Sequence, residues 1–401
     1  MDPKGTTPVS REEERFFLRA GWLVDGLGGL PRGAVIEVRG DRVEAVHEAG
    51  EAPDGPVLDF SGCTVIPGLV DAHLHLAMSG GSDPRLRERQ LDPDWPMARG
   101  LIEQHLSACL AHGVVAVRDG GDRRGFALHY LASGLKTHGV MVQAAGRAWH
   151  APERYGSLIG RSPGPGRSLA REIVADSGPR GVVKIVQSGL NSLVEYRRLT
   201  PPQFSYNELA PAVDAARACG LTVMAHANGE EPVRIAVDAG VASVEHGFFM
   251  GRENLARMAD KGVVWVPTAV TMAAYAQVLA AQSPQAGMAR RILDNQMEQL
   301  AWARDLGVRV ATGTDAGSPG VFHGPAMAWE MALYMEAGWT LAEAVSAATR
   351  EGARLLGLPN LGVLSPGKDA TFLAAPGPPE DLLANLAHPR AVFVRGVEVS
   401  G

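Results

Sequence analysis

The sequence predicts an α/β fold: a (β/α)8 TIM barrel joined to a small, discontinuous β-sandwich built from both termini. Eight apolar runs, each followed by a segment able to form a helix, occupy the middle of the 401-residue chain. Short alternating strands occur at both ends, and neither end has enough strands to be stable alone. The alternative is an open, doubly wound sheet, but no GxGxxG motif follows the first strand of the barrel segment to support it.

The composition is that of an ordinary globular protein, with 46% hydrophobic and 20% charged residues. A net charge of −6 gives no basic patch, so we expect no nucleic-acid partner. No apolar run reaches the roughly 18 residues of a membrane span, so no membrane association is expected. The three cysteines are widely spaced and odd in number, which is typical of a reducing compartment and predicts a cytoplasmic protein.

The two ends of the chain have a different residue pattern from its middle. Residues 1–15 are polar, lack the apolar core of a signal peptide and are predicted to form a flexible N-terminus. Alternating strands with turn residues such as Asp25-Gly26 follow, and similar strands recur near the C-terminus. We therefore predict the two parts of the sandwich at 16–64 and 363–401, with the barrel at 65–362.

The barrel strands are expected where apolar runs occur, and two of the intervening helices have clear start signals. Ser205 with Glu208, and Thr340 with Glu343, each fit a capping box. The eight predicted strands are 65–72, 114–118, 140–145, 182–187, 221–226, 241–246, 263–267 and 308–312.

The first of these runs ends in two histidines, His73 and His75. Residues i and i+2 of a strand point to the same face, so the two imidazoles project side by side. In a barrel of this type, the chemistry lies at the carboxyl ends of the strands. The pair is therefore a candidate site for a divalent cation.

Other polar residues are predicted at the same rim: His226, His246 and Asp315 follow later strands, and Lys184 lies within an apolar run. A charged ammonium group in a barrel interior is costly, because burial disfavours the charged form. Burial lowers the pKa of a lysine and leaves a free amine. Such an amine can take up carbon dioxide as a carbamate, and the two oxygens of a carbamate could bridge two cations.

Taken in order, these motifs resemble those of the amidohydrolase superfamily, and most nearly its imidazolonepropionase-like and prolidase-like branch. The resemblance extends from about residue 16 to 399. The matching stretches are PGLVDAHLH at 67–75, VKI at 183–185, AHANG at 225–229, VEHG at 244–247, TGTDAG at 312–317 and GVLSPGKDA at 362–370.

The resemblance implies a binuclear centre, with zinc as the expected metal. It implies that His73, His75 and Asp315 hold one ion and that His226 and His246 hold the other. Lys184, carboxylated by CO2 to N6-carboxylysine, would bridge the two ions. The implied catalytic residues are Asp315, as general base and acid, with Lys184 and His246. The implied reaction is hydrolysis of a C–N bond in a small amide, peptide-like or cyclic amide substrate, and association into a homo-oligomer is expected.

The sequence departs from the branch pattern at two places. Asn228 stands where branch members often have a second histidine, and the segment around His150 replaces a Gly-Gly-His-Gly stretch. By position, His150, Tyr155, Asn228 and His323 are candidate substrate contacts. The long segments 80–96 and 269–284 follow barrel strands, and loops on this face often shape the pocket.

Two other functions are considered. A mononuclear deaminase of an aminated heterocycle would share the His-x-His start and would need a glutamate soon after His226, a role for which Glu230 is the candidate. A non-catalytic barrel scaffold is the second alternative, although scaffold relatives usually lack the metal ligands.

Overall fold

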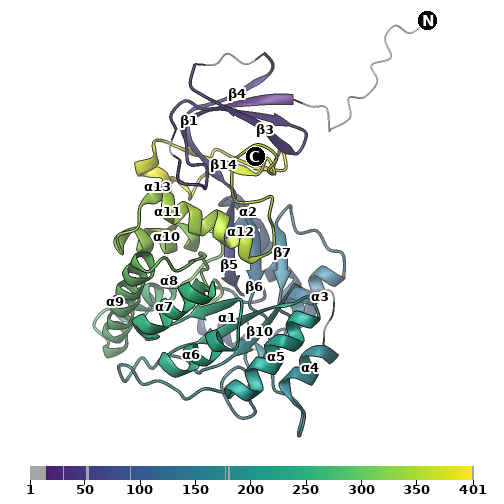
Figure 1. Ribbon diagram of the computed structural model, residues 1–401, viewed down its shortest axis with the longest axis vertical. Helices are drawn as coiled ribbons and strands as arrows, with labels where there is room; N and C mark the ends of the chain where they lie inside the picture. The colour runs from purple at the N-terminus through teal and green to yellow at the C-terminus, as the bar shows by residue number, and fades with distance from the viewer. Residues whose placement is uncertain are drawn as a thin grey trace, which may run out of the picture.

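The computed structural model describes residues 15–29, 31–50, 54–90, 92–176, 178 and 181–399. A β unit lies at one end of the molecule and a larger body of strands and helices at the other (Figure 1). The predicted flexible segment 1–15 lies outside the described residues, except for Arg15, which begins the first strand.

The β unit is a seven-stranded sheet that both ends of the chain build. Its order is β16-β15-β14-β4-β1-β2-β3, and only β1 and β4 pair in parallel. An isolated bridge joins Arg42 of β3 to Asp369, which lies just before β14, so the sheet curls back toward its own middle. Apolar side chains from both ends, including Leu18 and Phe372, form its core. The prediction that the termini combine in one β unit is confirmed. The strands are β1 Arg15–Leu23, β2 Val35–Arg39, β3 Arg42–His47, β4 Val57–Pro67, β14 Phe372–Pro376, β15 Ala391–Val394 and β16 Val397–Glu398.

The predicted strand 65–72 is in fact shared between the two parts of the molecule. Val65–Pro67 completes β4 in the sheet, and the barrel strand β5 begins at Leu69. The break falls at Gly68, where a Cβ atom would lie 2.5 Å from the side chain of Val115. Only glycine allows so close an approach. Its N–H donates to the carbonyl of Thr371 in the C-terminal part of the chain.

The barrel strands pair in parallel in two groups. One group is β5-β6-β7, and the other runs β8-β10-β11-β12-β13. Residues 145–147 connect β7, the last strand of the first group, to β8, the first strand of the second group. The barrel strands are β5 Leu69–Leu74, β6 Val114–Asp119, β7 Met141–Ala144, β8 Ala148–Trp149, β10 Val182–Val186, β11 Thr222–Ala227, β12 Ser243–His246 and β13 Val264–Val266, and the short β9 Gly160–Arg161 pairs with β8.

The ring closes through the predicted eighth strand, 308–312. This segment forms one isolated bridge, between Val310 and Trp265, and not a full strand. It nevertheless has partners on both sides: the N–H of Trp265 donates to Arg309, and the N–H of Ala72 in β5 donates to Thr312, each at 2.9 Å. The segment is short because the N–H of Thr312 donates to the carbonyl of Ala347 and not to a neighbouring strand. These hydrogen bonds link β13 to β5, as the predicted barrel requires and as an open doubly wound sheet would not need.

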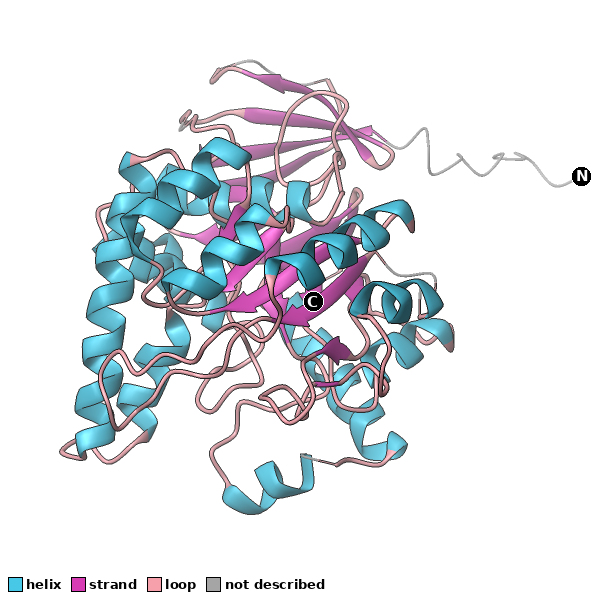
Figure 2. Ribbon diagram, turned by 60° about the horizontal axis from the view of Figure 1, so that its bottom comes forward, coloured by secondary structure: helices cyan, strands magenta, loops and turns pink. Residues whose placement is uncertain are grey.

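Helices surround these strands (Figure 2). Both predicted capping boxes are confirmed: Glu208 and Glu343 accept the backbone N–H of Ser205 and Thr340. Among the described residues, no helix is both long enough and apolar enough to cross a bilayer. The helices are α1 Pro84–Gln90, α2 Trp95–Ala111, α3 Phe126–Ala132, α4 Leu169–Ala175, α5 Tyr206–Ala218, α6 Glu230–Asp238, α7 Gly251–Lys261, α8 Val270–Val278, α9 Pro284–Asp305, α10 Ala326–Glu336, α11 Leu341–Ser346, α12 Gly352–Leu355 and α13 Leu382–Asn385. A π-helical turn, Ala347–Glu351, joins α11 to α12, and a 3-10 turn, Pro379–Asp381, precedes α13.

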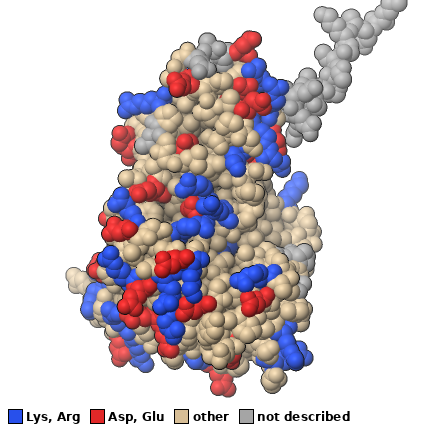
Figure 3. Space-filling view, in the orientation of Figure 1, with Lys and Arg blue, Asp and Glu red and all other residues tan. Residues whose placement is uncertain are grey.

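Charged side chains of both signs are interspersed on the face shown in Figure 3. Exposed ion pairs of the structure include Arg304 with Glu343 at 3.2 Å and Arg217 with Asp214 at 2.8 Å. Exposed pairs of this kind contribute about 0–1 kcal/mol each. The fold is therefore held mainly by its continuous apolar core, which extends from the barrel strands to the helices around them.

Candidate metal centre

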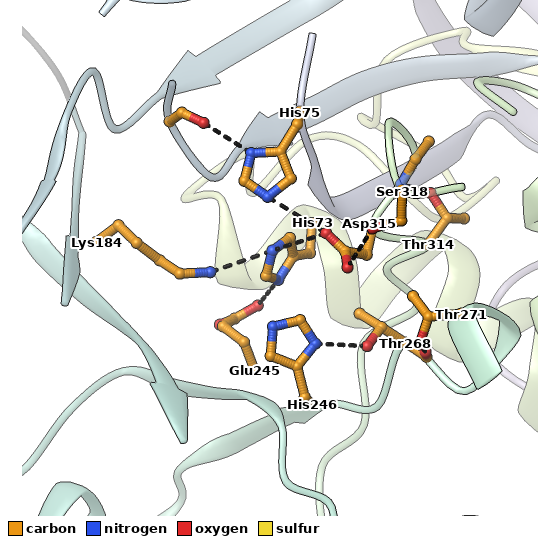
Figure 4. Close-up of polar contacts among 12 residues, drawn as sticks. His73, His75, Lys184, Glu245, His246, Thr268, Thr271, Thr314, Asp315 and Ser318 are labelled. Atoms are coloured by element: carbon orange, nitrogen blue, oxygen red, sulfur yellow. Dashed lines mark hydrogen bonds and ion pairs between the residues drawn. The ribbon is translucent and has the colours of Figure 1, made fainter. Parts of the chain in front are cut away.

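The end of β5 presents His73 and His75 toward the carboxylate of Asp315 (Figure 4). Their Nε2 atoms lie 3.6 and 3.3 Å from Asp315 Oδ1. One ligand atom from each of the three residues falls within 4.8 Å of the others. This is a compact group of two imidazoles and one carboxylate, a donor set that suits a divalent transition metal.

Each of these histidines is held by its other ring nitrogen. The Nδ1 atom of His73 lies 2.7 Å from Glu245 Oε2, and that of His75 lies 2.7 Å from the carbonyl oxygen of Gly121. These acceptors place the proton of a neutral ring on Nδ1, so that Nε2 is the nitrogen that would bind a metal. Burial would lower the pKa of His75, but the Asp315 carboxylate that faces its Nε2 raises it. A Cβ atom on Gly120 would lie 2.9 Å from the His75 ring, so glycine is required beside it.

The Asp315 carboxylate is ionised and fixed. Burial alone would raise its pKa, but the hydrogen bond with His75 and the neighbouring imidazoles hold the pKa well below its usual range. Ser318 Oγ donates to Asp315 Oδ2 at 2.9 Å, which leaves Oδ1 directed at the two histidines. The carboxylate can therefore act as a ligand and as a proton acceptor.

Lys184 lies in the middle of β10, fully buried, and points into the same group (Figure 4). Its Nζ is 3.1 Å from His73 Nε2. Burial lowers the pKa of Lys184 to about 8. The amine therefore gives up its proton far more readily than an exposed lysine, as carbamate formation requires.

His226 and His246, at the ends of β11 and β12, complete the group. The ring centroids of His226 and His246 are 4.5 Å apart, and those of His73 and His246 are 4.9 Å apart. Burial, with the nearby Lys184 charge, lowers the pKa of His226 to about 3 and that of His73 to about 4. Burial likewise lowers the pKa of His246. Neutral imidazoles are the form that binds metal ions.

The orientation of this second pair depends on uncharged partners. His246 Nδ1 lies 2.7 Å from Thr268 Oγ1, and His226 Nε2 lies 3.3 Å from the carbonyl of Gly189. These contacts involve Nδ1 of His246 and Nε2 of His226. The other ring nitrogens, Nε2 of His246 and Nδ1 of His226, take no part in them. All six side chains predicted to hold metal are thus brought together at the carboxyl ends of the strands.

Three residues of the centre have strained backbone. Asp315, His246 and Thr268 have φ values of 56°, 67° and 47°, in the left-handed region that non-glycine residues rarely occupy. Each such residue costs about 1–3 kcal/mol, and such conformations cluster at functional sites. The strain therefore supports a functional role for this end of the barrel.

A buried ion pair that was not predicted from the sequence lies behind His73. Glu245 and Arg118 are both fully buried, and Arg118 Nη2 donates to Glu245 Oε1 at 2.9 Å. Burial would raise the pKa of Glu245, but the Arg118 charge and the His73 hydrogen bond lower it to about 2. A weaker signal was present in the sequence, because each of these charged residues follows apolar residues near the carboxyl end of a strand.

A cavity of about 230 Å³ opens over the centre, and Tyr155 and Asn228 line it. Asn228 also ties two loops together, since its Oδ1 accepts the N–H of Phe248 and its Nδ2 donates to Gly189. The other two predicted substrate contacts do not line the cavity. His150 is buried, with Nδ1 2.8 Å from its neighbour's carbonyl in Ala151.

The fourth candidate, His323, lies behind the centre and not on the cavity wall. Its ring stacks on His105 with centroids 3.8 Å apart, and its Nε2 lies 3.2 Å from the carbonyl of His75. Position in the sequence suggested a pocket residue, but the packing of His105 holds the ring away from the opening. Among the described residues that line the cavity, neither His323 nor His150 is found.

Both long segments predicted to shape the pocket do contribute to it. The segment 80–96 supplies Arg87, and the segment 269–284 supplies Thr271, Met272 and Tyr275. The latter three lie on α8, which also packs into a small apolar cluster around Phe248.

Glu230, the residue required by the deaminase alternative, does not reach the centre. Its side chain is 68% exposed and lies 3.5 Å from Arg197. It is the first residue of α6, and its carbonyl accepts a hydrogen bond from Asn254. Glu230 is also not among the described residues that line the cavity.

The model of the amidohydrolase family matches residues 64–399. An uncharacterized protein of Mycobacterium tuberculosis is 29% identical over 84% of this chain and 85% of its own length. The imidazolonepropionase of Geobacillus thermodenitrificans is 28% identical over 87% of this chain and 83% of its own. A solved Xaa-Pro dipeptidase with bound methionine has a TM-score of 0.81 and 25% identity, covering 97% of this chain and all of that one. Aspergillus niger ochratoxinase, with a TM-score of 0.79, 22% identity and coverage of 97% and 96%, shares the fold.

Proposed function

Because this chain belongs to the amidohydrolase family of metal-binding hydrolases, we propose that it hydrolyses a carbon–nitrogen bond in a small amide, peptide-like or cyclic amide substrate. The observation that carries the proposal is the convergence of His73, His75 and Asp315 within 4.8 Å, with Lys184 Nζ 3.1 Å from His73. We further propose Asp315, Lys184 and His246 as the catalytic residues.

The donor set suits two divalent ions, and we propose zinc. His73, His75 and Asp315 would hold one ion, and His226 and His246 the other. The chemistry of the donors supports this assignment, because the three imidazoles of His73, His226 and His246 are neutral and the carboxylate is ionised. Two cations at this position would lower the pKa of a water molecule they share and polarise the substrate carbonyl.

Lys184 is proposed to bind both ions as its N6-carboxy form. A free lysine beside His73 would bring a positive charge next to a cation, whereas a carbamate brings two anionic oxygens. The buried amine with a pKa of about 8 favours this reaction with CO2, because the neutral nitrogen is the nucleophile. The modification converts an unfavourable buried charge into a ligand.

Asp315 moves the proton in this proposal. Its carboxylate accepts a proton from the attacking water and delivers it to the leaving nitrogen of the substrate. Ser318 holds Oδ2 at 2.9 Å, so Oδ1 keeps its direction through the transfer. Tyr155 and Asn228, on the cavity wall, are proposed to contact the substrate.

The test combines metal analysis with a substrate screen. Protein prepared with zinc and bicarbonate should bind about two ions per chain and should release amines from some members of a library of dipeptides, N-acyl amino acids and cyclic amides. Isotopically labelled bicarbonate should enter a carbamate at Lys184. A single ion per chain with ammonia released from an aminated heterocycle would replace the proposal by the deaminase, and a metal-free, inert protein would replace it by the scaffold.

A further inference from the structure

Arg87 brings an uncompensated positive charge to the wall of the cavity. It lies on α1, and one nitrogen, Nη1, donates to the carbonyls of Ser79, Gly317 and Gly81 at 3.1, 3.3 and 3.4 Å. Its other nitrogens donate to no acceptor among the described residues, and its guanidinium forms no ion pair with a carboxylate in that part of the chain. One side of the planar guanidinium group of Arg87 is thus fixed through Nη1, and its other side is free to bind a ligand.

Among the described residues of the cavity wall, no carboxylate forms an ion pair with this guanidinium. Asp315 is the single acidic residue on the described wall, and His73, His75 and Ser318 already surround its carboxylate. A half-buried guanidinium without a counter-ion is stabilised when a ligand supplies an anion. Carboxylates match the planar fork in geometry and charge, and they form two parallel hydrogen bonds with it.

A second unsatisfied group lines the same cavity. The Oδ1 atom of Asn191 is buried and has no hydrogen-bond partner among the described residues. A buried acceptor without a donor costs free energy, so a ligand that brings an N–H group to it gains affinity. The wall also has apolar side chains on which an apolar group could pack, among them Met78, Leu158, Ile159, Leu193, Phe248 and Met272.

We propose that Arg87 binds a carboxylate of the substrate, and that the substrate is an N-acyl amino acid with a secondary amide and a large apolar group. The carboxylate pairs with the free edge of Arg87, the amide N–H donates to Asn191 Oδ1, and the apolar group packs on the wall. This proposal rests on the proposed hydrolase function and specifies its substrate class. Addition of water across the C–N bond gives a carboxylic acid and a free amino acid, so atoms and charge balance.

The kinetic test compares matched substrates with zinc-loaded protein. The pairs are N-benzoyl-L-leucine against its C-terminal carboxamide, and against its N-methylated form. Wild type should prefer the free acid by at least ~10-fold in kcat/KM, mainly through KM, since charged hydrogen bonds are the stronger class. Arg87→Gln should remove the preference for the acid, and Asn191→Leu should remove the preference for the N–H compound. Arg85→Gln, on the exposed side of the same helix, should change neither.

The binding test does not depend on turnover. Calorimetry with 3-phenylpropionate and 3-phenylpropionamide, on zinc-loaded and on chelator-treated protein, should show a preference of at least ~10-fold for the acid, lost in Arg87→Gln and reduced in Arg87→Lys. Thermal melting checks that the variants fold. Equal binding of acid and amide by wild type, or an unchanged preference in Arg87→Gln, overturns the proposal. Retained acid binding without hydrolysis of any library member would instead reject the hydrolase function and leave the Arg87 site standing.

Discussion

The two halves of the metal centre differ in one respect: a histidine of the first half has a charged partner, whereas His75 and both histidines of the second half have neutral ones. His73 is held by the carboxylate of Glu245, which is itself paired with Arg118. His246 is held by a threonine hydroxyl and His226 by a backbone carbonyl at 3.3 Å. The first half also contains the ionised Asp315, whereas the second half has no carboxylate among its described members.

Because of this charged partner, we expect the first half to be the more rigidly held. Hydrogen bonds to charged groups are roughly twice as strong as neutral ones, and a carboxylate partner makes a ligating imidazole more basic. We therefore expect the half formed by His73, His75 and Asp315 to bind its ion more tightly and to fill first. Lys184, adjacent to His73, is the residue that connects the two halves.

The largest effect on metal content and turnover is expected from removing Lys184, which connects the two halves. Lys184→Ala, and Lys184→Met as a variant of more similar volume, should lose one or both ions and reduce turnover by more than the ~100-fold typical of outer partners of a metal site. Metal analysis and steady-state kinetics measure both. Lys136→Ala, at an exposed position, is the control. Full metal content and normal turnover in Lys184→Met would show that no bridging group forms there.

A smaller effect is expected from weakening the first half. Glu245→Gln keeps the shape of the side chain but removes the charge beside His73 and leaves Arg118 buried without its counter-ion. Affinity for the tighter ion should fall by ~10–100-fold. Titration with a zinc indicator measures this affinity, with the exposed Glu298→Gln as control. An unchanged tight site would mean that the carboxylate has no part in orienting His73.

Weakening the second half should reduce the affinity for metal ions by a smaller factor. Thr268→Val removes the hydroxyl 2.7 Å from His246 Nδ1 and keeps a β-branched side chain. Because the partner is neutral, we expect at most a ~10-fold loss, confined to the weaker ion. The same indicator titration separates the two sites. If Thr268→Val weakened the tight ion as much as Glu245→Gln does, the proposed difference between the halves would be wrong.

The smallest effect on metal binding is expected at Glu330, which supports the second half from behind. Its buried carboxylate accepts the N–H groups of Ala269 and Val270, next to Thr268. Burial raises the pKa of Glu330 to about 8, so the folded state binds its proton more tightly than the unfolded state does. This contribution to stability is fully present below the pKa of the unfolded chain and is lost as the pH rises through about 8.

Glu330→Gln should remove this pH dependence and leave metal affinity unchanged. Between pH 5 and 8, the unfolding free energy of wild type should fall by up to ~1.4 kcal/mol per pH unit more than that of the variant. Chemical denaturation at several pH values measures the slopes. Glu336→Gln, exposed on the same helix, should behave as wild type. Parallel pH profiles for wild type and Glu330→Gln would contradict the raised pKa.

Local sequence patterns determined the barrel and the positions of the six metal-binding candidates. The alternation of a strand places His73 and His75 on one face, and a lysine within Val-Val-Lys-Ile-Val can only point into the barrel or into its helices. The carboxyl ends of parallel strands meet at one rim, so residues such as His226 and His246 needed no knowledge of the loops to be placed together.

The tertiary structure alone decided which partners surround those candidates. His73 and Glu245 are separated by 172 residues, and no local pattern pairs them. The course of the loops decided that Arg87 and Tyr155 reach the cavity and that His323 turns back onto His105. The physical reason is that the direction of a side chain on a strand follows from short-range geometry, whereas the path of a loop depends on long-range packing that a sequence pattern does not encode.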